Sequence, residues 1–217
     1  MAEVEQLLRG YRRFYKQHFL DQEATLPALA RDGQSPTALV IACSDSRVDP
    51  AIITDAAPGE IFAIRNVANL VPPYQPDNET YHGTSAAVEF AIQNLGIKHI
   101  IVLGHSGCAG IDALLNSTDE TPAKGSFVLP WVNIARKAKD YVLNLLGSPQ
   151  HPDANATCEQ QAVLVSLQNL MTFPWIEEKV NHGQLKLHGW YFRIATGRLH
   201  TWDHVTDSFV RQPVDGE

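Results

Sequence analysis

TALVIACS, residues 37–44, is a continuous apolar run that follows a proline and ends in a cysteine and a serine. A short apolar run of this kind is typical of a strand that is buried on both faces of a sheet. The same pattern recurs in EIFAIRN (60–66), which follows the turn signal Pro58-Gly59, and in HIIVLGH (99–105). These three runs predict the buried strands of one sheet.

The segment between the second and third runs, TSAAVEFAIQNLG (84–96), has the periodicity of a helix. It places Ala87, Phe90 and Ala91 on one face and ends in Gly96, a residue favoured at helix C-termini. A buried strand, a crossover helix and another buried strand together predict a parallel sheet.

Further helices and a hairpin surround this core. Apolar residues at three- and four-residue steps predict helices over 3–19, 131–147 and 159–171, whereas the polar segment 116–126 predicts a surface loop. Near the end, apolar and polar residues alternate over 184–204, which predicts a β-hairpin at the sheet edge. We therefore predict an α/β fold with a mostly parallel central sheet, an antiparallel edge hairpin, flanking helices and an N-terminal helical arm.

The chain has 217 residues, which suffices for one domain with extensions, and no linker or repeat divides it. We predict a single domain over 1–217. It comprises a helical arm at about 1–30, an α/β core at about 36–116, and C-terminal helices and the hairpin at about 128–210.

The charge balance is negative, with 17 basic and 24 acidic side chains, a net charge of 17 − 24 = −7. Nucleic acids and anionic membranes require clustered positive charge, which this chain lacks, so neither is an expected partner. No apolar run approaches the roughly 18 residues of a membrane span. The N-terminal residues lack the basic and apolar regions of a signal peptide, so we expect a cytoplasmic protein.

The three cysteines, Cys43, Cys108 and Cys158, are an odd number for a chain of this size, so a disulfide framework is not expected. Metal binding, catalysis and plain burial remain as their roles. Cys158 lies in a predicted helical region far along the chain, where a packing role is the simplest interpretation.

Two polar motifs follow predicted parallel strands: Cys43-Ser-Asp45-Ser-Arg47 ends the first, and His105-Ser-Gly-Cys108 ends the third. Ligands of an open α/β sheet bind beyond the carboxyl ends of its strands, so we expect the two motifs to meet. Two thiolates and one imidazole suit Zn²⁺ in a tetrahedral site whose fourth position is left for water or substrate. Asp45 and Arg47 are either a surface ion pair or residues that support the metal, and their place beside the proposed ligands favours the second interpretation.

Four motifs together resemble the β-class carbonic anhydrases: residues 43–47, the stretch 58–69, His105-Ser-Gly-Cys108 and Leu187-His-Gly-Trp190. The similarity covers residues 30 to 115 closely and the C-terminal hairpin more loosely.

The resemblance implies a zinc ion held by Cys43, His105 and Cys108, and attack of zinc-bound hydroxide on carbon dioxide to give bicarbonate and a proton. In the family, the residue matching Asp45 accepts a hydrogen bond from that hydroxide. The residue matching Arg47 holds the carboxylate away from the metal.

The resemblance also implies a substrate pocket that contains Gln34, Phe62, Val67 and Phe90, with Ala109 where the family usually has glycine. The Gln34 amide would donate a hydrogen bond to a bicarbonate oxygen, and the three apolar side chains would suit carbon dioxide. From spacing alone, those three would be assigned to the core. The methyl group of Ala109 would narrow the pocket slightly.

Within the family, the plant-type branch is the most similar. Another branch, whose aspartate binds zinc at low pH, has a tryptophan three residues before the first ligand cysteine, where this chain has Val40. Arg65 matches a residue of both branches and does not distinguish them. We therefore expect an open site near neutral pH, with water rather than Asp45 as the fourth zinc ligand. Phe90 and Asn94 stand where relatives often carry tyrosine and histidine, so no proton shuttle is nominated.

The family builds each active site at a dimer interface, so the resemblance implies a homodimer or a dimer of dimers in which the helix over 3–19 embraces the partner. Packing of that helix on its own domain is the alternative. Three other functions share the motifs: turnover of carbon disulfide or carbonyl sulfide, zinc-dependent binding without turnover, and thiol redox chemistry. Asp45 and Arg47 argue against pure binding, and the lack of a CxxC spacing argues against redox chemistry.

Overall fold

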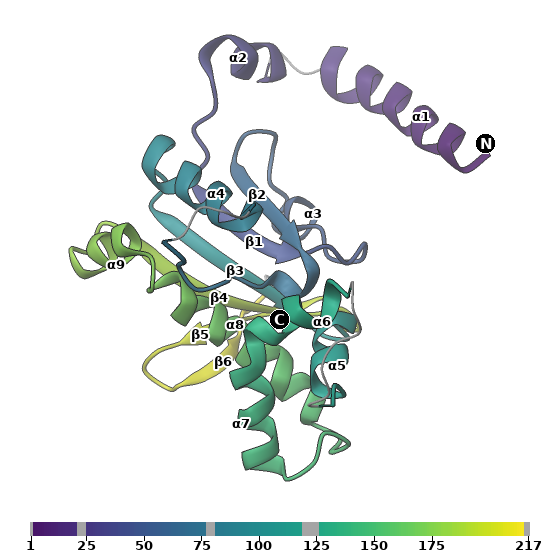
Figure 1. Ribbon diagram of the computed structural model, residues 1–217. Coiled ribbons are helices and arrows are strands. Elements are labelled where there is room, and N and C mark those ends of the chain that lie inside the picture. Colours follow the sequence, from purple (N-terminus) through teal and green to yellow (C-terminus); the bar gives the residue numbers. More distant parts are fainter. Residues whose placement is uncertain (1, 21–24, 77–80, 119–125, 215–217) are drawn as a thin grey trace.

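The computed structural model describes residues 2–20, 25–76, 81–118 and 126–214 (Figure 1). These residues form one six-stranded sheet with the order β2-β1-β3-β4-β5-β6. The strands are β1 (Ala38–Cys43), β2 (Ile61–Asn66), β3 (His99–His105), β4 (Lys186–Arg193), β5 (Arg198–Asp203) and β6 (Ser208–Arg211).

The first four strands of this order are parallel, and the last two are antiparallel additions at one edge. The three strands predicted from apolar runs are confirmed to within one residue at each end. The hairpin is confirmed as β4 and β5, which connect through a turn with Gly197 at φ 63°. A further strand, β6, was not predicted from the sequence; it has four residues and pairs with β5.

The central position of β1 explains its unbroken apolar sequence, because all six of its residues are buried. Leu39 and Ile41 point into a cluster that includes side chains of α4, α8 and α9. Val40 and Ala42 point to the opposite face, where Ile53 of α3 packs against the cluster. The chain therefore needs apolar residues at consecutive positions of this strand.

The described helices connect and cover these strands. They are α1 (Ala2–Phe14), α2 (Thr25–Asp32), α3 (Pro50–Thr54), α4 (Gly83–Glu89), α5 (Ala109–Leu115), α6 (Val128–Val132), α7 (Arg136–Leu146), α8 (Ala154–Leu170) and α9 (Pro174–Asn181). Shorter turns are η1 (Tyr15–Leu20), η2 (Val67–Asn69), η3 (Phe90–Asn94) and η4 (Asn133–Ala135). None of the described helices is both long and apolar enough to cross a membrane.

The predicted helices exist, but their regularity was overestimated. The helices predicted over 3–19 and 84–96 each pass into a π-helical turn, η1 and η3. The helix predicted over 131–147 is divided by the 3₁₀ turn η4, and α8 begins at Ala154, before its predicted start at residue 159. Side-chain periodicity tolerates such changes in backbone hydrogen bonding, so it does not reveal them. Residues 119–125 of the predicted loop lie outside the described part of the chain.

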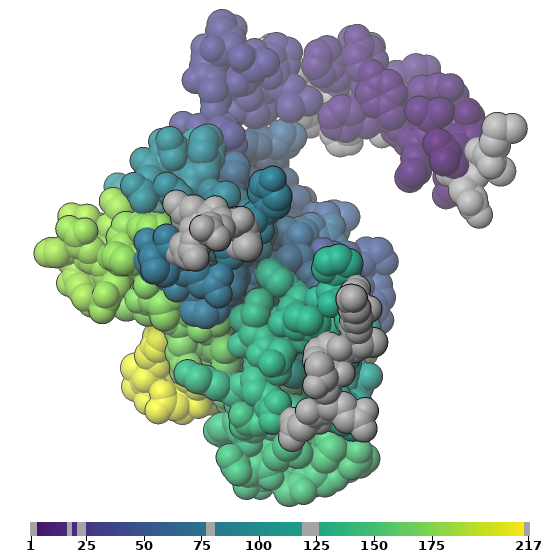
Figure 2. Space-filling model, viewed as in Figure 1, coloured from purple at the N-terminus to yellow at the C-terminus, as the bar shows by residue number. Residues whose placement is uncertain are grey.

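The N-terminal helix α1 leads away from the sheet rather than packing on it (Figures 1 and 2). Its apolar stripe is open to solvent in the single chain: Leu7 is 74% exposed, Tyr11 60% and Val4 61%. The alternative in which this helix packs on its own domain is therefore wrong for the single chain. An apolar stripe of this kind requires another surface to cover it.

Gly104 on β3 lets α8 approach the sheet, because a Cβ atom there would lie 2.5 Å from Val163 Cγ2. We expect Gly104→Ala to lower the free energy of unfolding by about 1–3 kcal/mol through overpacking, measured by urea denaturation. Gly83→Ala is the control, since a Cβ atom at that helix position has no heavy-atom neighbour within 4 Å. Equal stability of the two variants would contradict this account of the contact.

Candidate metal centre

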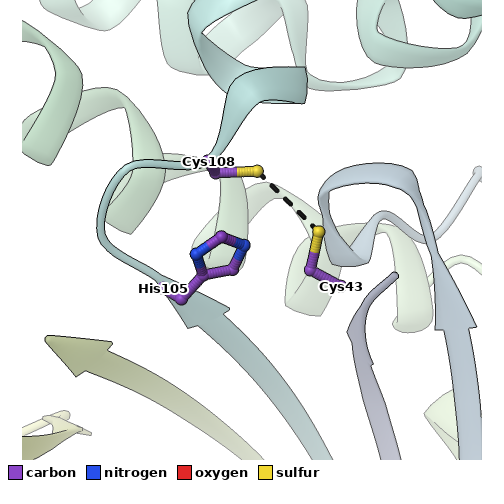
Figure 3. Close-up of side chains that lie close together, drawn as sticks. All are labelled: Cys43, His105 and Cys108. Atoms are coloured by element: carbon purple, nitrogen blue, oxygen red, sulfur yellow. Dashed lines mark hydrogen bonds between the residues drawn. The ribbon is translucent and has the colours of Figure 1, made fainter. Parts of the chain in front are cut away.

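Three potential metal ligands meet at the carboxyl ends of β1 and β3 (Figure 3). Cys43 is the last residue of β1, and His105 is the last residue of β3. Cys108 follows after a two-residue turn in which Gly107 has φ 70°, and it directly precedes α5. The strand ends therefore fix two of the ligands, and the turn presents the third.

The geometry of the three side chains fits a tetrahedral zinc site. Their ligand atoms all lie within 4.8 Å of one another, and the Sγ atoms of Cys43 and Cys108 are 4.0 Å apart. Two thiolates bound to one tetrahedral zinc at about 2.3 Å lie about 3.8 Å apart. The sulfur separation therefore needs almost no adjustment to hold the ion.

The imidazole of His105 supports the same assignment. Its Nδ1 lies 3.0 Å from the carbonyl oxygen of Ser106, to which it donates a hydrogen bond. In the neutral imidazole Nε2 therefore carries the lone pair, and this buried atom has no hydrogen-bond partner within the described residues. A buried nitrogen without a partner is costly, and a metal ion in the cluster would satisfy it.

The two thiols beside the imidazole differ in acidity. Their mutual hydrogen bond lowers the pKa of Cys43 and raises the pKa of Cys108, which burial raises further. One negative charge is therefore stable in the cluster, whereas a second requires compensation. A divalent cation provides it, because metal binding displaces thiol protons.

Cys158 does not belong to the cluster. It is fully buried in the apolar core beneath α5 and α7, and burial raises the pKa of its thiol to about 12. Its interpretation as a packing residue is confirmed.

Asp45 and Arg47 form a bidentate ion pair beside the cluster. Arg47 Nε donates to Asp45 Oδ1 at 2.9 Å, and Nη2 donates to Oδ2 at 2.7 Å. These hydrogen bonds hold the pKa of the Asp45 carboxyl well below its usual range. Arg47 Nη2 also donates to the carbonyl oxygen of Gly107 at 3.0 Å, so the pair joins the segment after β1 to the turn after β3.

Arg65 supports the backbone of the first motif, a contact that the sequence pattern did not reveal. Its guanidinium donates to the carbonyl oxygens of Cys43 at 3.0 Å and of Asp45 at 2.7 Å, and it pairs with Asp49 at 2.9 Å. Its match to a residue of the family and its position near the end of a predicted strand were visible in the sequence, but neither reveals the direction of the side chain.

Two of the predicted pocket residues lie at the start of α5 or pack against it. Ala109 directly follows Cys108, and Val67 Cγ1 would lie 2.8 Å from a Cβ atom at Gly110, so Val67 packs against the start of α5. Trp131 Nε1 donates to the carbonyl oxygen of Val67 at 2.7 Å and fixes that turn.

Of the other pocket residues, Phe62 lies on β2 and Phe90 is the first residue of η3. The rings of Phe62 and Phe90 are 6.0 Å apart, and Gln34 is exposed in the segment between α2 and β1. The spacing-based assignment to the core is wrong for Val67 and Phe90, which are 40% and 44% exposed, whereas Phe62 is partly buried and packs against the core cluster of β1. Apolar periodicity shows which residues favour burial. It does not show whether their own chain or a neighbouring subunit buries them.

A mostly parallel α/β sheet that presents two thiols and an imidazole at adjacent strand ends defines a metal-binding α/β protein. Residues 38–199 match the family model described as carbonic anhydrase. The chain belongs to this family, in its β class.

Similar proteins support this assignment along most of the chain. "Beta carbonic anhydrase 5, chloroplastic" from Arabidopsis thaliana is 39% identical over 189 residues, which are 87% of this chain and 61% of that protein. The structure of the β-carbonic anhydrase CcaA has a TM-score of 0.88 and 35% identity, covering 97% of this chain and 100% of that one. A tetrameric β-carbonic anhydrase from Sordaria macrospora has a TM-score of 0.79 and 27% identity, covering 93% and 97%.

Proposed function

We propose that this protein is a zinc-dependent carbonic anhydrase that interconverts carbon dioxide and bicarbonate, with release of a proton on hydration. The observation that carries the proposal is the buried Nε2 of His105, which has no hydrogen-bond partner in the described part of the chain and lies beside the sulfur atoms of Cys43 and Cys108. When bound there, zinc supplies an attacking water whose pKa is lowered to about 7. Membership of the β class supports carbon dioxide as the substrate.

Asp45 and Arg47 orient the attacking water in this proposal. The Asp45 carboxylate stays charged because Arg47 donates to both of its oxygens, so it accepts a hydrogen bond from the water and directs a lone pair at carbon dioxide. The same two hydrogen bonds restrain the carboxylate from turning to the metal. We therefore propose an open site near neutral pH, and an Asp45–zinc bond in a crystal grown at pH 8 would contradict it.

The proposed activity is tested by measuring zinc content together with stopped-flow hydration of carbon dioxide from pH 6 to 9. We expect about one zinc per chain and a rate that rises through the range in which the bound water ionises. Zinc-free protein with a Cys43–Cys108 disulfide would indicate redox chemistry instead. Sulfide release from carbon disulfide without carbon dioxide hydration would indicate the analogue substrate.

We also propose that the pocket is completed by a second copy of the chain. Val67 and Phe90 are apolar and exposed, and the Gln34 side chain is also exposed, so a neighbouring subunit would enclose these side chains. The Sordaria macrospora relative, which shares the fold, is described as tetrameric. A homodimer, or a dimer of dimers, is the proposed assembly, with residues 1–217 as one domain in each subunit.

Charge on the apolar stripe of α1 tests this assembly. We expect the double variant Leu7→Glu, Tyr11→Glu to at least halve the molar mass measured by light scattering at micromolar concentration, because two charges would be buried in the interface. Gln6→Glu, on the opposite face of the helix, adds charge without touching the stripe and is expected to leave the mass unchanged. Unchanged mass in the double variant would contradict a role for α1 in assembly.

The compartment is proposed to be the cytoplasm. All three cysteines are free thiols, which suits a reducing compartment, and the Arabidopsis relative is named as chloroplastic. Fractionation of cells that express the tagged full-length protein distinguishes these two locations.

A further inference from the structure

Glu159 is a buried carboxylate that the proposed reaction does not use. It lies on α8, is only 4% exposed, and has apolar neighbours along most of the helix. Burial of a carboxylate is costly unless both oxygens have partners. Both do: Oε1 accepts a hydrogen bond from the backbone N–H of Cys108 at 2.9 Å, and Oε2 accepts one from the hydroxyl group of Tyr191 at 2.6 Å.

The hydrogen bond to Glu159 holds Cys108, the one proposed ligand that lies outside the strands of the sheet. Cys43 and His105 are strand residues with ladder partners on neighbouring strands, whereas Cys108 follows a turn and precedes α5 without capping it through its side chain. Its amide is held by a side chain 51 positions further along the sequence. The position of this sulfur therefore depends on a tertiary contact.

Other contacts hold the same turn at neighbouring atoms. Ser106 Oγ accepts a hydrogen bond from the backbone N–H of Ile194 at 2.9 Å, and Arg47 donates to the carbonyl oxygen of Gly107. Glu159, by contrast, accepts its hydrogen bond from the backbone of the proposed ligand Cys108. Tyr191, on β4 and 2% exposed, holds the second oxygen and so fixes the direction of the carboxylate.

We propose that Glu159, oriented by Tyr191, is a positioning residue for the metal ligand Cys108. This inference rests on the proposed zinc site. By holding the Cys108 amide, the carboxylate keeps the Sγ atom at its distance from Cys43 and His105. Its removal would loosen one of three protein ligands without changing the ligand set. Outer residues of this kind affect metal affinity by about 10–100-fold.

The test compares three variants by the rate at which zinc passes to a chromophoric chelator at 25 °C. Glu159→Leu removes both acceptors at similar volume, and we expect zinc release about 10–100-fold faster than in the parent. Glu159→Gln keeps an acceptor for the Cys108 amide and places an amide donor near the Tyr191 oxygen, so release is expected to stay within about threefold of the parent rate. Tyr191→Phe is expected to fall between them, because it frees one oxygen only.

A second readout separates positioning from general loss of stability. In the cobalt-substituted protein, the thiolate-to-cobalt absorption band is expected to shift in Glu159→Leu and to keep its position in Glu159→Gln. Ser166→Ala is the matched control, since Ser166 is also buried on α8 and hydrogen-bonded but contacts backbone at Asn69 and Val71 instead of a ligand. We expect it to lower the melting temperature without changing zinc release.

The outcomes are distinguishable. Parent-like zinc release in Glu159→Leu, or fast release in Glu159→Gln, would overturn the positioning role while leaving the proposed function intact. If Glu159→Leu fails to fold, parent-like release in Tyr191→Phe overturns it. A parent protein that holds no zinc would overturn the proposed function, and with it this inference.

Discussion

Replacement of His105 by alanine is expected to abolish zinc binding and carbon dioxide hydration together. The imidazole is one of three protein ligands, and its Nε2 has no other partner within the described residues. We expect the zinc affinity to fall by more than the roughly 100-fold that loss of an outer supporting residue costs. The measurement is metal content after dialysis, with hydration followed by stopped flow on the same sample.

The control for this prediction is Cys158→Ala, which removes a thiol outside the cluster. It is expected to reduce stability through a small cavity while keeping zinc and the hydration rate per zinc. A His105→Ala protein that retained stoichiometric zinc and full activity would refute the assignment of the metal centre. Loss of zinc in Cys158→Ala would contradict the assignment of Cys158 to packing rather than to the metal centre.

The second large effect is expected from Asp45→Asn. The variant keeps all three proposed ligands, so zinc content should remain that of the parent, whereas the hydration rate should fall by about 10²–10⁴-fold. The reason is that an amide can orient its N–H group, rather than an acceptor, toward the attacking water. Because Arg47 holds the pKa of Asp45 well below its usual range, the loss should be similar at every pH from 6 to 9.

Asp32→Asn is a matched control elsewhere in the chain. Arg31 donates to both oxygens of Asp32, at 2.8 and 2.7 Å, in the same bidentate arrangement, but both side chains are exposed on the surface. Its replacement should leave zinc content and rate unchanged, because exposed pairs contribute little. A parent-like hydration rate in Asp45→Asn across the whole pH range would contradict the role of Asp45 in orienting the attacking water.

The fold was predicted most accurately where local pattern and tertiary environment agree. β1 and β3 are buried almost throughout, so their continuous apolar sequences marked their ends to within one residue. β6 was missed because its Ser-Phe-Val-Arg sequence is short and largely exposed, and only its pairing with β5 makes it a strand. The 3₁₀ and π-helical turns were missed because they alter hydrogen bonding without disturbing apolar periodicity.

The candidate ligand set could be proposed from the sequence, because cysteine and histidine at the ends of adjacent parallel strands lie close to one another. The residues that hold these side chains in place could not be predicted in the same way. Arg65 lies 22 positions from Cys43, and Glu159 lies 51 positions from Cys108. Neither separation has a local periodicity that would mark the contact.

The sequence by itself determined the parallel α/β core, because its strands are local apolar runs, and the candidate trio Cys43, His105 and Cys108, because these residues end or follow two of those strands. Only the tertiary structure decided that Arg47 joins the two motifs and that the Cys108 amide is held by a buried glutamate. It also decided that Val67 and Phe90 face outward. The physical reason is that burial and hydrogen-bond partners are properties of the folded packing, in which segments far apart in sequence compete for the same space.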